Sequence, residues 1–146
     1  MDIKLQQDTA CKEVKVCITY AEMDQSVERL YKLVKSYGKS IKCNLDNTEV
    51  WVSASDIYYI ESIDKRTYVY CEKEVYQCEL RLYQVLEELQ EFEFVQVSKS
   101  SILNVKTLKR IRPLINSRME ATLSNGEKIN VTRKYVSAIK QKLMER

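Results

Sequence analysis

Short alternating segments, separated by turn residues, fill most of the chain between residues 40 and 123. Their β-branched and aromatic content predicts strands. We expect strands near residues 40–46, 49–53, 56–61, 67–72, 74–78, 94–97, 101–104, 107–114 and 118–123. Asn125-Gly126 follows the last of these and predicts a hairpin turn into one more strand. Without a βαβ repeat, the pattern indicates an α+β fold built mainly from antiparallel strands.

Two further segments have the 3.6-residue period of amphipathic helices. Residues 80–91 combine an apolar stripe with a Glu-rich outer face. A last helix is expected from Arg133 to about Met144, with the Thr132 side chain as its N-terminal cap. Both helices should lie at the periphery of the strands, each with its apolar face turned inward.

Residues 1–45 predict a short βα extension in front of the main domain. Alternating polar and apolar residues over 12–20 indicate a strand with one buried side. Asp24 can cap a helix that runs to about Tyr37 and ends at Gly38. Such a unit is too small to be stable alone. Its apolar stripe and strand edge need cover, so we expect the extension to support homodimerisation.

Charge is distributed unevenly along the chain. The segment from Val95 to Arg146 holds 12 Lys or Arg and three Glu residues, a net charge of +9, whereas residues 1–94 have a net charge of −6. This segregation indicates a surface that attracts a polyanion, with nucleic acid as the first candidate. The alternative from charge alone is a basic surface that acidic neighbours balance after folding.

The composition argues against an enzyme. The chain has no histidine, so the commonest general base and metal ligand is missing. With only two glycines it has no Gly-rich loop to hold a phosphate or a dinucleotide. We therefore expect no catalytic site, no metal, no cofactor and no small-molecule substrate.

Cysteine usage and the absence of long apolar runs favour a cytoplasmic protein. The five cysteines are odd in number and form no CxxC pair, which is atypical of a secreted disulfide framework. We interpret them as small strand residues packed in the core. A redox-sensing thiol is the alternative, with Cys71 and Cys78 as the pair to consider. The first residues show no signal peptide, and no segment is long and apolar enough to cross a membrane.

Four segments, in this order, resemble the LytTR DNA-binding domain of bacterial transcription regulators. They are DIYYIES (56–62), FVQVSKSSILN (94–104), LSNGEKI (123–129) and VTRKY (131–135). Each is weak alone, but the ordered set extends over about 100 residues and is specific. The resemblance implies that residues 46–146 form an elongated, mostly antiparallel β domain with peripheral helices. In that family the loops enter successive major grooves from one side of the duplex.

The resemblance also implies which residues contact DNA. Three loop regions carry them: Lys65, Arg66 and Thr67; Ser98, Lys99 and Ser100; and Arg133 and Lys134. The chemistry of these side chains agrees, because a guanidinium can bond the O6 and N7 edge of guanine whereas lysines mostly hold phosphates. We expect Arg133 to read a base and Lys99 to contact base and phosphate. Lys65, Arg66 and Lys134 should clamp the backbone.

Several alternatives stay open at these positions. Arg133 could instead form a salt bridge with Glu127 or Glu120, and Asn104 is expected to bond backbone groups rather than DNA. Tyr58, Tyr59, Tyr68 and Tyr70 are interpreted as sheet and core packing, not as a base-stacking platform. The rival function is a protein-interaction or anti-activator module that uses the same basic face on an acidic partner.

The extension is too short for a receiver domain, so the chain resembles the stand-alone group of the family. We expect such a small module to bind repeated DNA sites as a homodimer, because linked copies gain affinity for paired sites. The likeness also suggests a small membrane protein as a possible regulatory partner.

Overall fold

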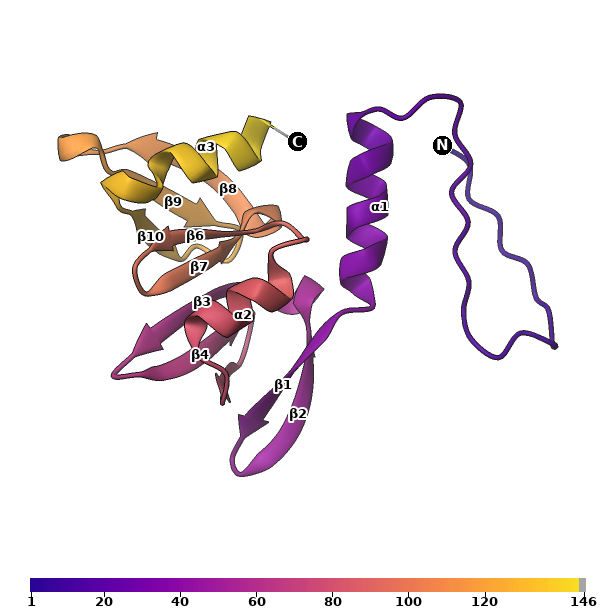
Figure 1. Cartoon of the computed structure of the whole chain (residues 1–146), viewed down its shortest axis with the longest axis horizontal. Coiled ribbons are helices and arrows are strands. Elements are labelled where there is room, and N and C mark those ends of the chain that lie inside the picture. The colour runs from indigo at the N-terminus through magenta and orange to yellow at the C-terminus, as the bar shows by residue number, and fades with distance from the viewer. Residues whose placement is uncertain (145–146) are drawn as a thin grey trace.

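The computed structural model of the chain describes residues 1–144, which form two antiparallel sheets with helices around them (Figure 1). The first sheet has seven strands in the order β2-β1-β5-β4-β3-β7-β6. Its strands are β1 (Ser40–Leu45), β2 (Thr48–Ser53), β3 (Ile57–Ile63), β4 (Arg66–Cys71), β5 (Val75–Cys78), β6 (Phe94–Ser98) and β7 (Ser101–Asn104). All their pairings are antiparallel, as the sequence predicts.

The second sheet has three strands in the order β10-β9-β8. They are β8 (Leu108–Pro113), β9 (Met119–Leu123) and β10 (Lys128–Val131). The hairpin predicted at Asn125-Gly126 joins β9 to β10, and Gly126 has a φ of 90°, a backbone conformation that favours glycine. The amide of Glu127 donates to the Asn125 side chain at 3.0 Å, which closes the turn.

Three α-helices accompany the sheets: α1 (Gln25–Tyr37), α2 (Leu82–Leu89) and α3 (Val136–Met144). Asp24 begins α1 as expected, because its carboxylate accepts the Val27 amide at 2.9 Å and the Ser26 hydroxyl at 2.7 Å. These two bonds lower the pKa of the Asp24 carboxyl below its usual value. None of the described helices is long and apolar enough to span a membrane.

The start of the last helix differs from the expectation. Residues Arg133–Tyr135 form a 3₁₀ turn, η4, and the α-helix proper begins only at Val136. Thr132 makes no capping bond to η4; its hydroxyl instead donates to the Val97 carbonyl at 3.5 Å. Thr132 thus links the end of β10 to the seven-stranded sheet and does not cap a helix.

Two apolar clusters form the core, one on each face of the seven-stranded sheet where β3 pairs with β7. The first is built around Ile41, Cys43, Val52, Ile57, Ile60, Val69, Val85, Leu89, Phe94 and Ile102. The second joins the two sheets and α3 through Val95, Val97, Leu103, Val105, Ala121, Leu123, Val131 and Ile139. Adjacent residues Ile102 and Leu103 face opposite clusters, because successive side chains of a strand point to opposite faces.

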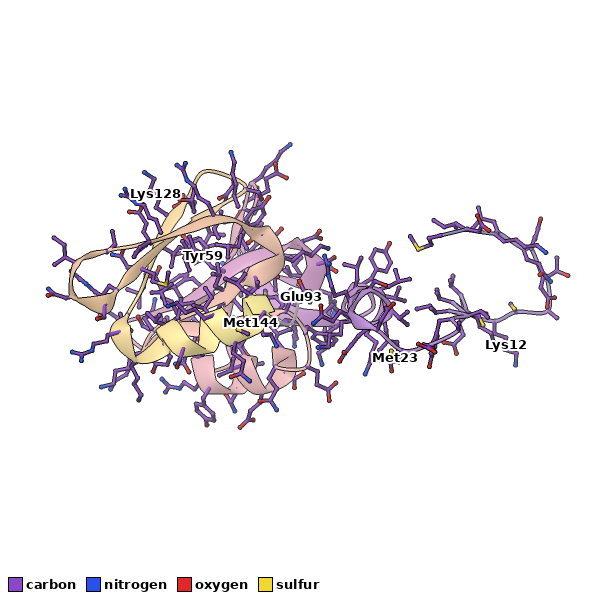
Figure 2. All side chains as sticks on the ribbon, turned by 90° about the horizontal axis from the view of Figure 1, so that it is seen from above. Lys12, Met23, Tyr59, Glu93, Lys128 and Met144 are labelled. Carbon is purple, nitrogen blue, oxygen red and sulfur yellow. The ribbon has the colours of Figure 1, made fainter. Side chains whose placement is uncertain are left out.

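The N-terminal extension contains a helix but not the predicted strand. Residues 12–20 lie outside any strand, and Val14 and Val16 are 92% and 62% exposed. The reason is that a strand needs a partner edge, and no edge of either sheet lies beside this segment; Figure 2 shows Lys12 apart from the sheets. The predicted domain boundary after residue 45 also divides β1 from β2, which pair along their whole length.

The cysteines also depart in part from expectation. Cys43, Cys71 and Cys78 lie on strands and are buried or half-buried, as predicted, whereas Cys11 and Cys17 are exposed. Cys71 and Cys78 are not neighbours, because Cys78 is opposite Thr67 and Cys71 is opposite Ile57. Burial raises the pKa of the Cys71 thiol to about 11. Cys71 and Cys78 are therefore not placed to pair with each other.

Candidate nucleic-acid interface

The three loop regions singled out in the sequence lie side by side at one end of the molecule, the left end in Figure 1. The β3–β4 turn adjoins the β6–β7 turn, because the Ser62 amide donates to the Ser100 carbonyl at 2.8 Å. The β6–β7 turn adjoins η4, because the Thr132 amide donates to the Val97 carbonyl at 2.9 Å. We call the β3–β4 turn, the β6–β7 turn and η4 the turn row.

The β3–β4 turn presents two basic side chains. Ile63 pairs with Arg66, so Asp64 and Lys65 alone make the turn, both with positive φ (50° and 66°). Such a two-residue turn matches the twist of the flanking strands. Lys65 and Arg66 are exposed, and Arg81 from the start of α2 donates to the Lys65 carbonyl at 3.2 Å.

Thr67 does not fit the predicted role. Its side chain is only 2% exposed and belongs to β4, since the turn ends one residue before Arg66. A duplex cannot reach this side chain without unpacking the strand. Thr67 is therefore a core residue, and the exposed side chains that this turn offers to a ligand are those of Lys65 and Arg66.

The β6–β7 turn presents Lys99 at its tip. Ser98 pairs with Ser101, which leaves Lys99 and Ser100 as exposed turn residues. The half-buried Ser98 hydroxyl accepts the Ser100 amide at 3.2 Å. Ser98 thus shapes the turn, while the Lys99 ammonium is free to contact a ligand.

The third member of the row, η4, presents Arg133 and Lys134, both exposed. The Lys134 ammonium lies 5.6 Å from the centre of the Tyr135 ring, which steadies its position. Behind η4, helix α3 is anchored to the second core cluster by Ile139. The backbone that carries Arg133 is therefore fixed from both sides, by Thr132 and by α3.

The basic side chains of the turn row have no carboxylate partners among residues 1–144. The ion pairs there are Lys32–Glu28, Lys35–Glu91, Lys39–Glu88, Lys42–Glu49 and Arg112–Glu120. Glu120 is thus occupied by Arg112 at 3.0 Å, and the alternative Arg133–Glu120 or Arg133–Glu127 bridge does not form. Lys32, Lys35, Lys39 and Lys42 of the acidic half are paired with glutamates, while the cations of the turn row are not.

Two residue groups have the structural roles that the sequence predicted. Asn104 is 2% exposed; its amide donates to the Ile57 carbonyl at 2.8 Å and its oxygen accepts the Lys106 amide at 3.1 Å. Tyr59 and Tyr70 stack across the strands with ring centres 4.2 Å apart. Burial raises the pKa of the Tyr59 hydroxyl to about 12, so this stack stays neutral near pH 7.

The β8–β9 turn also lies at this end of the molecule, which was not predicted from the sequence. Met119 pairs with both Val131 and Pro113, so the β8–β9 turn, residues 114–118, emerges beside η4. Arg112 precedes this turn and Arg118 is its last residue, and both are visible in the sequence. Only the strand pairing shows that they lie at the same end as Arg133.

Comparison with known proteins agrees with this fold. The model of the LytTr DNA-binding domain family matches residues 48–144. Sensory transduction protein LytT of Bacillus subtilis is 29% identical over 138 residues, which are 94% of this chain and 54% of that protein. LytT of Enterococcus faecalis is 29% identical over 92 residues, which are 63% of this chain and 38% of that protein. The chain thus spans about half, or less, of these relatives.

A solved structure extends the likeness to three dimensions. The LytTr DNA-binding domain of a methyl-accepting/DNA response regulator from Bacillus cereus superposes with a TM-score of 0.68 and 28% identity. The superposition covers 73% of this chain and 98% of that domain, so it includes nearly the whole known fold. Because the family match at residues 48–144 includes every strand except β1, together with α2 and α3, the chain belongs to the LytTr DNA-binding domain family.

Proposed function

We propose that this chain is a sequence-specific regulator of transcription that binds double-stranded DNA through the turn row. The observation that carries the proposal is a set of exposed, uncompensated cations on three adjacent turns. Phosphates attract such cations, and the release of counterions drives binding. DNA binding also fits the family, and we propose no enzymatic activity.

The spacing of the turns suits a major groove. The β3–β4 and β6–β7 hairpins are neighbours in the sheet, so their turns are centred two strand spacings apart, or ~10 Å. A major groove is about 12 Å wide. One turn can therefore approach the bases while its neighbour contacts the backbone, and η4 continues the row toward the next groove.

The proposed roles follow from side-chain chemistry. Arg133 reads a guanine edge because its guanidinium can donate two parallel bonds and its backbone is fixed. Lys99, at the tip of its turn, contacts base and phosphate. Lys65, Arg66 and Lys134 hold phosphates and set the register. Ser98 and Ser100 support Lys99, and the buried Thr67 supports the sheet.

Replacing Arg133 with alanine should weaken binding to the preferred duplex by about 1–3 kcal/mol and relax selectivity at one base pair. The preferred duplex is obtained by selecting purified protein on a random duplex library. Affinity is then measured by fluorescence anisotropy at two salt concentrations. Lys73, exposed in the β4–β5 turn away from both the turn row and α1, provides the matched control, since Lys73→Ala should leave affinity unchanged.

The same selection separates this function from its rival. An enriched sequence bound far more tightly than a scrambled duplex supports a specific regulator. A selection without enrichment, or an Arg133→Ala variant with unchanged affinity and selectivity, contradicts the proposal. If the selection gives no enrichment, a protein-interaction or anti-activator module becomes the better explanation of the basic face.

We further propose that the chain binds repeated sites as a homodimer through α1. Leu33 and Tyr37 lie four residues apart on one side of this helix and are 42% and 78% exposed, so they offer an apolar contact to a second copy. Linked copies gain affinity for paired sites without new DNA contacts. A small membrane protein is also proposed as a partner; that part is based on the family resemblance alone.

Sedimentation velocity tests the dimer directly. The chain should sediment as a dimer at micromolar concentration, and Tyr37→Glu should convert it to a monomer by burying a charge at the interface. Tyr83→Glu, at a 64% exposed position on α2, is the matched control and should leave the dimer intact. A monomeric parent protein would exclude this role for α1.

A further inference from the structure

The β8–β9 turn, residues 114–118, extends the turn row by one element. Val131 at the end of β10 pairs with Met119 at the start of β9, and Met119 also pairs with Pro113 at the end of β8. The centre of the turn is therefore about one and a half strand spacings from the strand that leads into η4, or ~7 Å. Figure 1 shows both at the left end of the molecule.

The backbone of this turn is held in one shape. The Leu114 amide donates to the Arg118 carbonyl at 2.8 Å, and Asn116 and Ser117 both have positive φ, 65° and 61°. This geometry turns Ile115 outward, with 81% of its surface exposed. A large apolar side chain at the tip of a turn has no packing role in the isolated chain.

Arg118 has the same electrostatic character as the turn row. It is exposed and forms no ion pair within residues 1–144, whereas nearby Arg112 is neutralised by Glu120. Residues 114–118 contain no acidic side chain. Lys109 and Arg110 differ, because they lie on the edge strand β8, where charge protects a sheet against edge pairing. Arg118 precedes β9, a central strand, so edge protection does not explain it.

We infer that the β8–β9 turn is a fourth DNA-contacting segment, with Arg118 binding a backbone phosphate and Ile115 making an apolar contact with a sugar or a thymine methyl group. Arginine suits a phosphate because it donates several bonds in one plane. The methyl group of thymine is the apolar feature of the major groove. This inference depends on the proposed function, since it extends the surface on which the duplex lies.

The test compares Arg118→Ala, Ile115→Ala and Lys73→Ala with the parent chain on the selected duplex and on a scrambled duplex. Lys73 is exposed in the β4–β5 turn, at the opposite end of the strands from the turn row, and is the matched control. Affinity is measured from low to moderate salt. Arg118→Ala should weaken binding to both duplexes by a similar factor and reduce the log–log salt slope by about 1. Ile115→Ala should weaken binding to the selected duplex, and Lys73→Ala should change neither affinity nor slope.

The outcomes distinguish a failure of this inference from a failure of the proposed function. A parent chain that selects a sequence, combined with unchanged affinity and slope in both turn variants, overturns the inference and leaves the proposed function intact. A parent chain without any preferred duplex overturns both. Arg118→Lys guards against a purely structural effect, because it keeps the charge and should keep the salt slope. The thermal unfolding temperature of the Arg118 and Ile115 variants should match that of the parent chain, since both side chains are exposed.

Discussion

Replacing Ile139 with alanine should lower the free energy of unfolding by about 2–5 kcal/mol, because the side chain is completely buried and leaves a cavity. Ile139 is the buried residue of α3, and it packs in the cluster that joins the two sheets. DNA affinity should fall as well, because α3 follows directly from η4 and helps to fix Arg133. Urea unfolding followed by circular dichroism measures the first effect, and anisotropy measures the second.

Met144→Ala is the matched control for this experiment. Met144 lies on the same helix, is 80% exposed and should change stability very little. An Ile139→Ala variant as stable as the parent would show that α3 is not anchored through this residue.

Replacing Asn104 with alanine should lower the free energy of unfolding by about 1–3 kcal/mol, even though the side chain is small and makes few apolar contacts. The substitution leaves the buried Ile57 carbonyl without the amide that donates to it at 2.8 Å. It also removes the acceptor of the Lys106 amide, which shapes the turn from β7 into β8. Guanidinium unfolding of the variant gives the size of the loss.

Asn130→Ala provides the comparison, since Asn130 is exposed on β10 and water can replace its bonds. Equal stability of the two variants would contradict a structural role for Asn104. A variant that stays stable but loses DNA binding would instead place Asn104 in the interface.

Much of the fold could be predicted because local pattern and local structure coincide along most of the chain. Alternation located the strands to within a few residues, and Asn125-Gly126 located the last hairpin because only a few residue types tolerate its backbone angles. The same alternation was misleading at residues 12–20. Periodicity shows that one side of a segment is apolar, but it does not show that a sheet edge is available to pair with it.

The candidate interface was predictable as a set of residues but not as a surface. Lys65, Lys99 and Arg133 stood out through the family resemblance, yet nothing local in the sequence joins the β3–β4 turn to the β6–β7 turn. That link is the antiparallel pairing of β3 with β7, which the bond from the Ser62 amide to the Ser100 carbonyl continues up to the turns. Thr67 was misassigned because the turn holds two residues, so the strand begins at Arg66 and buries the next side chain.

The side chains of the turn row are not the ones that stabilise the fold. The side chains that we propose to contact DNA stand on the tips of two-residue turns and on η4, while the apolar clusters that hold the sheets lie behind them. Exchanging Lys65, Lys99 or Arg133 for other residues therefore changes the chemistry of the surface without touching the core. Such a scaffold can acquire new operators by surface substitution alone, and a library randomised at these tips would be a practical route to designed regulators with the same folded frame.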